Sequence, residues 1–377
     1  MAQVKNWHLN REMKYPYADN RPKKQIAYIF DTNKCIACQT CTVACKTTWT
    51  SGKGQEYMFW NNVETKPYGS YPTQWDVNLL KQLDGQEWDK TTGTYKGKTI
   101  FEAAEKGENV KGWHPTDRDY AYPNLGEDEC SGNVNKGAFF SGIHDVWMFY
   151  LARICNHCTY PGCVAACPRK AIYKRPEDGI VLIDESRCRG YKECVKACPY
   201  KKTFFNEVTR ISEKCIGCYP LIEKGEQPRC VQTCIGKIRM QGFLSKPEEA
   251  RADNPIDQIV HIKKVALPLY PQYGTEPNVY YIPPVHVPKE FLHQLFGPGV
   301  DKAIETYKNI KNDKDLLGAF LLFGNTPKIT HSYKTDGEFT MGFDEKGEVT
   351  TKVPLTEPVF VRPFKNETTG ANHHNIP

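Results

Sequence analysis

Fifteen of the sixteen cysteines, all between Cys35 and Cys234, constrain what this chain can fold into more than any other feature. They fall into four groups with short, regular spacings. The first group follows the pattern C-x2-C-x2-C-x3-C, and the second and third end in C-x3-C-P. In chain order the groups are Cys35, Cys38, Cys41 and Cys45; Cys155, Cys158, Cys163 and Cys167; Cys188, Cys194 and Cys198; and Cys215, Cys218, Cys230 and Cys234.

This spacing is typical of cubane iron–sulfur sites. A tight loop presents three thiolates to one cluster, and the last cysteine, four positions farther along a helix, reaches the cluster of another group. Four groups therefore predict four clusters. The repeats argue against a disulfide framework, which is typical of short secreted chains, and against zinc, which does not need a repeated triplet followed by x3-Cys-Pro.

Tyr191 interrupts the pattern, because it stands where the third group should have its middle cysteine. Without a thiolate at that corner a cluster should hold three irons, so we predict a [3Fe–4S] site with Cys188, Cys194 and one cysteine from an x3 step. A [4Fe–4S] cluster with an oxygen or water ligand is the alternative. Losing one anionic ligand should raise the reduction potential, which suits the end of an electron path.

The composition predicts a soluble chain without a membrane anchor. Its 377 residues suffice for one large domain or two to three smaller ones. No run of about 18 apolar residues occurs, so we expect no transmembrane helix. The N-terminus lacks the apolar core of a secretory signal, so we expect that a partner would have to carry the protein out of the cytoplasm.

The formal charge of +6 does not indicate nucleic-acid binding. Fifteen thiolates and the oxidised cluster cores add about −8, which brings the loaded protein to about −2. We interpret the cations near the cysteines as charges that offset the clusters, with solvated surface as the alternative. They are Arg169, Lys170, Arg187, Arg189, Lys192, Lys196, Lys201 and Lys202.

Hydrophobic patterning predicts an α+β chain. Residues 25–31 should form a strand before the first group, and 145–154 a short helix or strand before the second. Residues 171–184 predict a hairpin between the second and third groups. Such a hairpin is typical of two-cluster ferredoxins, so we predict tandem bacterial-ferredoxin-like modules, each a βαβ-type two-cluster unit. Spacing leaves the pairing open: third with fourth, or nested, first with fourth and second with third.

We divide the chain into an N-terminal arm with the first group (1–46), a long insertion for subunit contact (47–142), a core with the other groups (143–240) and a C-terminal extension that wraps a partner (241–377). Residues 1–24 should lie over a partner or over the protein itself. The aromatics of the insertion should pack against another subunit or on a small core of their own. They are Tyr57, Phe59, Trp60, Tyr68, Tyr71 and Trp75.

Beyond Met240 the patterns predict several further elements. We expect strands at 259–266, 278–282 and 358–361, helices at 288–296, 300–310 and 314–323, and a hairpin over 338–353.

No catalytic motif is present in the sequence: there is no P-loop, no G-x-G-x-x-G before a helix, no H-E-x-x-H and no G-x-S-x-G. His157 is a candidate hydrogen-bond donor to sulfur, with an ordinary loop histidine as the alternative. Cys130 is interpreted as a thiol outside the clusters, and His373 and His374 as residues that bind no metal. The chain is therefore expected to carry electrons and to hold no substrate site.

The chain resembles the β (electron-transfer) subunits of molybdenum enzymes of the dimethyl sulfoxide reductase superfamily, in the nitrate reductase and nitrite oxidoreductase branch. The segments that carry this resemblance are CIACQTCTVACK, RICNHCTYPGCVAACPRKAIYKRPEDGIVLIDESRCRGYKECVKACPYKK and SEKCIGCYP. Two further segments, KGQEYMFWNNVETKPYGSYP and ALPLYPQYGTEPNVYYIPP, look particularly like the nitrite oxidoreductase β subunits of nitrite-oxidising and anammox bacteria.

The resemblance implies three [4Fe–4S] clusters and one [3Fe–4S] cluster with nested pairing. Nitrate reductase-type relatives carry Trp at the position of Tyr191, a departure with the same expected consequence. The implied ligand sets are Cys35, Cys38, Cys41 and Cys234; Cys45, Cys215, Cys218 and Cys230; Cys155, Cys158, Cys163 and Cys198; and, for the three-iron cluster, Cys167, Cys188 and Cys194.

The resemblance further implies an α subunit with a molybdenum bis-pterin cofactor that oxidises nitrite to nitrate. A haem-bearing γ subunit would take the electrons toward a c-type cytochrome. The alternatives are the β subunit of a nitrate, selenate or chlorate reductase or of a hydrocarbon dehydrogenase, and a free polyferredoxin. Such nitrite oxidoreductases work on the exported side of an energy-transducing membrane (a periplasm or an anammoxosome-like compartment), with the cytoplasmic face as the alternative.

Overall fold

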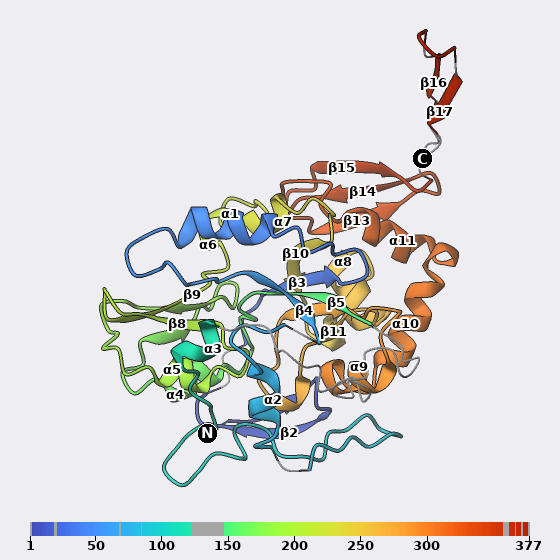
Figure 1. The fold of residues 1–377 in the computed structure, drawn as a ribbon. Helices are drawn as coiled ribbons and strands as arrows, with labels where there is room; N and C mark the ends of the chain where they lie inside the picture. The colour runs from blue at the N-terminus through green and yellow to red at the C-terminus, as the bar shows by residue number, and fades with distance from the viewer. Residues whose placement is uncertain are drawn as a thin grey trace, which may run out of the picture.

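A four-stranded sheet at the centre of the molecule joins segments that are far apart in the sequence (Figure 1). Its strands lie in the order β10 (Arg239–Leu244), β3 (Gln25–Asp31), β12 (Val279–Ile282) and β11 (Leu267–Pro268). β3 runs antiparallel to β10 and parallel to β12, and its alternate residues face two different hydrophobic cores. Burial on both faces explains its continuous apolar sequence and confirms the strand predicted at 25–31.

The computed structural model describes residues 2–18, 21–67, 69–83, 85–121, 147–356, 362–365, 367–370 and 372–375. Tyr68, Cys130 and the strand predicted at 358–361 lie outside these ranges. In the described part of the chain, no helix combines the length and the apolar character needed to cross a membrane.

The first and fourth cysteine groups meet at one end of the central sheet. β3 leads into the first group, which continues into α1 (Thr40–Trp49), and β10 follows the fourth group, which contains α6 (Tyr219–Ile222) and α7 (Arg229–Gln232). Because β3 and β10 are neighbours, α1 packs against α7 (Figure 1).

The second and third groups are held by a separate arrangement. β5 (Phe149–Arg153) leads into the second group, whose helix is α4 (Gly162–Ala166), and α5 (Glu193–Ala197) belongs to the third. α4 packs against α5. The strands between and after these helices are β6 (Ile172–Lys174), β7 (Val181–Ile183), β8 (Thr203–Asn206) and β9 (Ile211–Lys214). β6 and β7 form the hairpin predicted within 171–184, and β8 pairs with β9.

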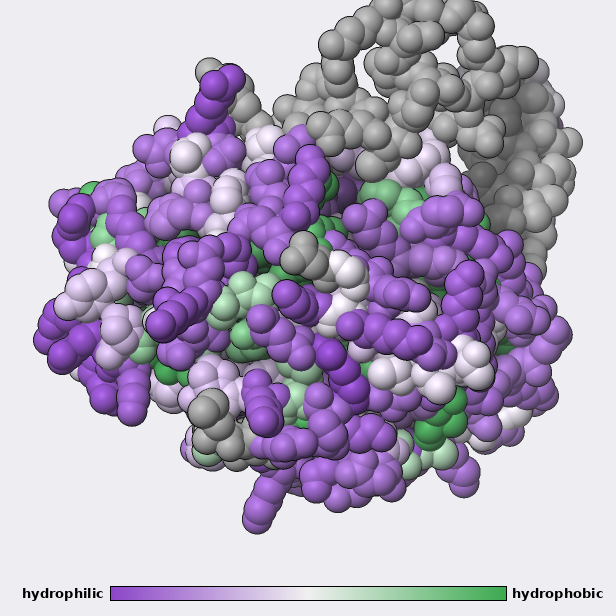
Figure 2. Space-filling model, turned by 90° about the horizontal axis from the view of Figure 1, so that it is seen from below, coloured by the Kyte–Doolittle hydropathy of each residue, from purple (hydrophilic) through white to green (hydrophobic). Residues whose placement is uncertain are grey.

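The N-terminal arm lies over this chain itself. β1 (Ala2–Asn6) and β2 (Arg11–Tyr15) form a hairpin. The Tyr15 ring stacks on Tyr160 with centroids 3.9 Å apart, and its hydroxyl donates to the Gly274 carbonyl at 2.6 Å. The side on which β2 and α2 (Trp75–Leu80) lie in Figure 1 is largely hydrophilic, with small separate apolar areas (Figure 2).

The insertion packs into the main core of this chain. Its described elements are β4 (Asn62–Lys66), which pairs with β5, then α2 and α3 (Asp117–Ala121). Trp75 is fully buried in the largest core, and Trp60 is buried beside the cysteine groups. The prediction that these two rings pack on another subunit or on a separate small core is therefore wrong. Tyr57, in contrast, is exposed.

Helices and short sheets follow the cysteine region, and most match the prediction. The helical segments are η1 (Pro247–Glu249), α8 (Pro255–Asp257), η2 (Gln258–Ile262), η3 (Pro271–Tyr273), α9 (Lys289–Phe296), α10 (Val300–Lys308), η4 (Ile310–Asn312) and α11 (Lys314–Leu321). The strands are β13 (Ser332–Thr335), β14 (Phe339–Phe343), β15 (Val349–Pro354), β16 (Arg362–Lys365) and β17 (Asn372–Asn375).

Residues 259–266 are the exception, because the predicted strand is wrong. The Asn254 side chain accepts a hydrogen bond from the Ile256 amide at 3.0 Å and so caps α8. The π-helical segment η2 continues this helix and buries Ile259 and Val260 in the second core. β-Branched residues favour strands, but the cap and the burial decide the conformation here.

A buried ionic network centred on Arg153 fixes the insertion to the core. Its guanidinium donates to the Glu64 carboxylate at 2.8 Å and to the carbonyls of Tyr200 at 2.7 Å and Tyr71 at 2.6 Å. It also stacks on the Trp75 ring, 3.9 Å from the centroid. All partners of this buried cation are therefore supplied by segments distant in sequence.

We predict that Arg153→Met destabilises the chain by about 3–5 kcal/mol, because it leaves Glu64 as a buried carboxylate without its main partner. Arg210→Met is the matched control, since Arg210 pairs with Glu207 at the surface and should change stability by less than about 1 kcal/mol. Urea unfolding followed by tryptophan fluorescence measures both. Equal midpoints for the two variants would contradict the prediction.

Candidate iron–sulfur sites

Two cavities in the described part of the chain are lined by cysteines of both the second and the third groups. One contains Cys155, Cys158 and Cys163 together with Cys198, the last cysteine of the third group. The other is lined by Cys167, the last cysteine of the second group, together with Cys188, Tyr191 and Cys194. Each group thus sends its last sulfur to the cavity of the other, as the x3 step predicts.

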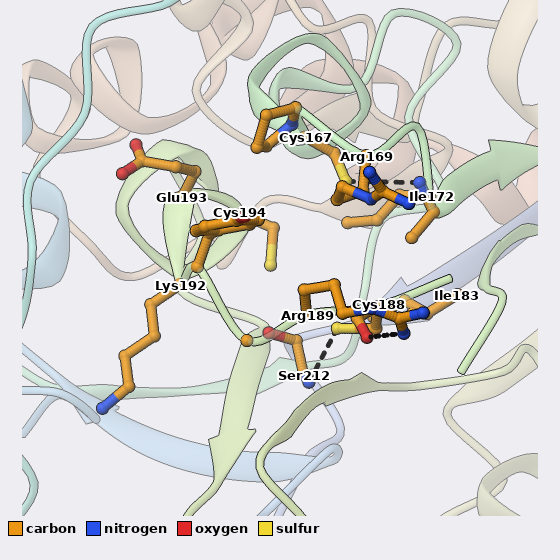
Figure 3. A pocket seen from close by; sticks show the side chains of 14 residues that line it. Cys167, Arg169, Ile172, Ile183, Cys188, Arg189, Lys192, Glu193, Cys194 and Ser212 are labelled. Carbon is orange, nitrogen blue, oxygen red and sulfur yellow. Dashed lines mark hydrogen bonds between the residues drawn. The ribbon is translucent and has the colours of Figure 1, made fainter. Parts of the chain in front are cut away.

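Among the described residues, three sulfurs surround the second cavity. Figure 3 shows the side chains of Cys167, Cys188 and Cys194 around a shared space, whereas Lys192 and Glu193 point away from it. The Ser212 amide donates to the Cys188 sulfur at 3.5 Å (Figure 3). Tyr191 lines the same cavity and is 60% exposed, so this site opens toward solvent.

Cysteines of the first and fourth groups also lie together across the chain. Burial raises the pKa of the Cys45 thiol, and the neighbouring Cys215, Cys230 and Cys218 raise it further. Cys45 therefore lies among three cysteines of the fourth group.

The first group receives a cysteine in return. Burial raises the pKa of the Cys35 thiol, and Cys41 and Cys234 act in the same direction. Cys38 is exposed, and hydrogen bonds to its sulfur from Thr40 lower its pKa.

Backbone amides point at many of these sulfurs. The amides of His157 and Gly217 donate to Cys155 at 3.5 Å and Cys215 at 3.4 Å. Both donors have positive φ angles, 42° and 64°, a backbone conformation that turns the loop around the sulfur. Three further amide donors pair with sulfur: Ala171 with Cys167 at 3.3 Å, Lys202 with Cys198 at 3.4 Å, and Ser212 with Cys188.

An indole also donates to sulfur, because Trp49 Nε1 lies 3.3 Å from Cys218 Sγ. Hydrogen bonds to sulfur stabilise negative charge on it and are one of the factors that set cluster potentials. The donor arrangement therefore fits sulfur ligands that carry negative charge.

His157 donates to sulfur, as predicted, through its backbone amide, and its ring has a separate role. Its backbone amide donates to Cys155, but its ring Nδ1 accepts from the Val181 amide at 3.1 Å and so holds β7. Nε2 must then carry the ring proton, and it is buried without an acceptor among the described residues. Because His157 lines the first cavity, a cluster bound there would offer this N–H a sulfur acceptor.

The chemistry of the buried thiols fits a metal cluster. Burial raises the pKa of Cys194, Cys215 and Cys230 to about 12 and that of Cys218 to about 11. Free thiolates are therefore unfavourable here, whereas metal coordination deprotonates thiols and releases the protons. Within the described ranges, no three Cys, His, Asp or Glu side chains converge as ligands of one ion; a multi-iron cluster requires sulfurs arranged around a larger space.

Few of the cations expected to offset cluster charge are buried. Lys201 and Lys202 are buried, whereas Arg169, Arg187 and Arg189 are exposed. The Lys201 ammonium donates to the carbonyls at the end of α5, including that of Lys196 at 2.7 Å, and thus caps this helix.

Two buried cations beside cysteines, Lys214 and Arg239, were not predicted from the sequence. Lys214 directly precedes Cys215, and a lysine next to a predicted ligand is a sequence signal that could have indicated a cation beside the sulfurs. Arg239 is a charge within the otherwise mostly apolar strand β10, which is a second such signal. Of the remaining candidates, Cys130 lies outside the described residues, and the side chains of His373 and His374 are not described.

Both ends of the cysteine array reach the surface. Around the first group, Ile36 is 65% exposed, Val43 58% and Ile235 65%. Ile235 belongs to the same surface, because a Cβ at the adjacent Gly236 would lie 3.3 Å from the Lys34 carbonyl. At the other end lies the exposed Tyr191.

Comparisons with known proteins agree with this arrangement. A family model described as a 4Fe–4S dicluster domain matches residues 146–244. The chlorate reductase subunit beta of Ideonella dechloratans is 46% identical over 313 residues, covering 75% of this chain and 90% of the relative. The dimethylsulfide dehydrogenase subunit beta of Rhodovulum sulfidophilum is 42% identical over 325 residues, with 78% and 92% coverage.

A third relative is the respiratory nitrate reductase subunit beta of Haloferax mediterranei. It is 42% identical over 311 residues, covering 75% of this chain and 84% of the relative. Identity at this level over most of each relative, together with the cysteine cavities, shows that the chain belongs to the family of iron–sulfur beta subunits of the nitrate and chlorate reductase type.

Proposed function

We propose that the chain is the electron-transfer subunit of a molybdenum oxidoreductase complex and holds three [4Fe–4S] clusters and one [3Fe–4S] cluster. The observation that carries this proposal is the exchange of last cysteines between groups, with Cys198 in one cavity and Cys167 in the other. Bound there, iron–sulfur clusters would carry one electron at a time. The chain holds them, shields them from water and directs amide donors at their ligands.

The proposed ligand sets follow nested pairing in two ferredoxin-like modules. The pairing of β3 with β10 and of α1 with α7 supports a module built from the first and fourth groups. The β6–β7 hairpin and the contact of α4 with α5 support one built from the second and third. The sets are Cys35, Cys38, Cys41 and Cys234; Cys45, Cys215, Cys218 and Cys230; Cys155, Cys158, Cys163 and Cys198; and Cys167, Cys188 and Cys194.

The two exposed ends support two partners. The apolar surface of Ile36, Val43 and Ile235 beside Cys38 fits a tight protein contact, and we assign it to the molybdenum α subunit. The end at Tyr191 would face the haem-bearing γ subunit, which delivers electrons toward a c-type cytochrome. We further propose that the complex works on the exported side of the membrane and that a partner carries its signal.

The substrate is decided outside this chain. Its relatives take their names from reductases and from a dehydrogenase, so beta subunits of this kind serve both directions of electron flow. We propose an oxyanion reductase partner, of the nitrate, chlorate or selenate type, as the first candidate, because chlorate and nitrate reductase relatives support it.

Nitrite oxidation is the second candidate, and it rests on the resemblance of two segments, 53–72 and 266–284. Residues of these segments serve the framework: Glu64 binds Arg153, and the Tyr270 hydroxyl donates to Asp76 at 2.7 Å. Framework positions do not contact the partner's substrate, which is why this second candidate has weaker support.

The first test uses electron paramagnetic resonance on the native, affinity-isolated complex. We expect a three-iron signal in the oxidised state and further signals after dithionite reduction. Nitrate, chlorate and selenate are then added separately, and the expected result is rapid reoxidation by at least one of them. Absence of iron–sulfur signals in an iron-replete complex would overturn the electron-transfer proposal; reduced clusters that ignore every oxyanion in a molybdenum-containing complex would overturn the substrate proposal alone.

A second test addresses the missing ligand. Tyr191→Cys supplies a fourth thiolate, so we expect the oxidised three-iron signal to disappear and a reduced [4Fe–4S] signal of lower potential to replace it. Tyr173→Cys is the matched control, because Tyr173 is also exposed but lies on β6, outside the ligand positions. A three-iron signal that persists in fully loaded Tyr191→Cys protein would contradict the assignment.

A further inference from the structure

Arg239 is a buried cation between the first and fourth cysteine groups. It is the first residue of β10 and lies opposite Phe30 of β3, with its guanidinium 4.4 Å from the Phe30 ring centroid. Only 1% of the residue is exposed. The same two strands that bring the cysteine groups together therefore also place this charge between them.

The guanidinium lies close to sulfurs of both proposed ligand sets. One terminal nitrogen, Nη2, lies 3.0 Å from Cys41 Sγ, which belongs to the first set. Burial raises the pKa of Cys230, which belongs to the second set, whereas the charge of Arg239 and a hydrogen bond from it lower this pKa. The other terminal nitrogen, Nη1, donates to Asn61 Oδ1 at 3.2 Å.

No carboxylate among the described residues offsets this charge. Among the described residues, Arg239 takes part in no ion pair with Asp or Glu, and its Nε is buried without a partner. The surrounding ionisable groups are sulfurs, because Cys41, Cys230, Cys234 and Cys35 stabilise the cation despite its burial. Arginine remains protonated in proteins, so a positive charge is fixed at this position.

We propose that Arg239 is a shared positive charge that raises the reduction potentials of two clusters at once, those of the sets containing Cys41 and Cys230. The inference rests on the proposed ligand sets. Reduction adds one negative charge to a cluster, and a nearby cation stabilises the reduced form more than the oxidised form. Because the site is buried, solvent screens this effect weakly.

The position between two clusters gives the charge a specific role. A cation that contacted one set only would change the difference between the two potentials and bias electron transfer toward that cluster. A shared cation lowers the cost of reducing either cluster and leaves the difference between the two potentials nearly unchanged, so it eases reduction of both clusters without favouring one over the other. We therefore assign Arg239 an electrostatic role in electron transfer: its charge stabilises the reduced forms of two clusters.

The test is a potentiometric titration of the native complex followed by electron paramagnetic resonance, with wild type and Arg239→Gln compared. We expect two of the four midpoints to fall together. Each fall should correspond to at least a tenfold loss in the equilibrium constant for reduction, which is about 59 mV for a one-electron couple. Arg239→Lys keeps the charge, so the equilibrium constant for reducing each of the two clusters should return to within about threefold of the wild-type value.

Asn61→Asp gives a second route that leaves Arg239 in place. The substitution is isosteric, and the Asn61 Nδ2 that it removes has no hydrogen-bond partner in the part of the chain that the structure describes. A carboxylate 3.2 Å from Nη1 would offset the guanidinium charge, so both midpoints should fall as in Arg239→Gln. This variant keeps the proposal testable if Arg239→Gln protein fails to incorporate clusters.

Arg229→Gln is the matched control, because Arg229 directly precedes Cys230 but its side chain is exposed and bonded to Gln232. It should change the equilibrium constant for reducing each cluster by less than about threefold. Unchanged midpoints in loaded Asn61→Asp or Arg239→Gln protein, a shift of one midpoint only, or a shift of all four would overturn the shared-charge proposal. Wild-type protein without four titrating clusters would instead overturn the proposed function.

Discussion

Compensation of negative charge on buried sulfur is the constraint on which the rest of the structure depends. Most of the cysteines are buried, and burial alone raises their pKa values far above those of exposed thiols. Backbone amides, the Trp49 indole and the Arg239 guanidinium donate hydrogen bonds to these sulfurs. Two of the amide donors, those of His157 and Gly217, have left-handed backbone angles that turn the loop around the sulfur.

The same constraint explains why the insertion is so long and so aromatic. Trp60 packs beside the cysteine groups, and Asn61 orients Arg239. Glu64 binds Arg153, on the strand that leads into the second group. The insertion thus builds a wall of the cluster region and supplies partners for its buried cations. A loop that only contacted another subunit would not need these buried groups.

Local sequence signals were sufficient where a short segment decides its own conformation. The strand at 25–31 and the hairpin within 171–184 follow from their apolar runs and turn residues, and the structure has both. Local signals failed to predict the conformation of residues 259–266, because the Asn254 cap and the burial of Ile259 outweighed β propensity there. His157 was recognised as a residue near sulfur, but which of its groups donates depends on Val181, 24 residues away.

The sequence by itself determined the number of cysteine groups, the gap at Tyr191 and the electron-carrying chemistry, because these follow from residue type and short spacing. Which groups meet was decided by tertiary structure. Spacing permitted the third group to pair with the second or the fourth, whereas the neighbouring strands β3 and β10 place the fourth beside the first. The location of Arg239 between two groups has the same origin, since a contact between residues 198 positions apart leaves no mark in local sequence.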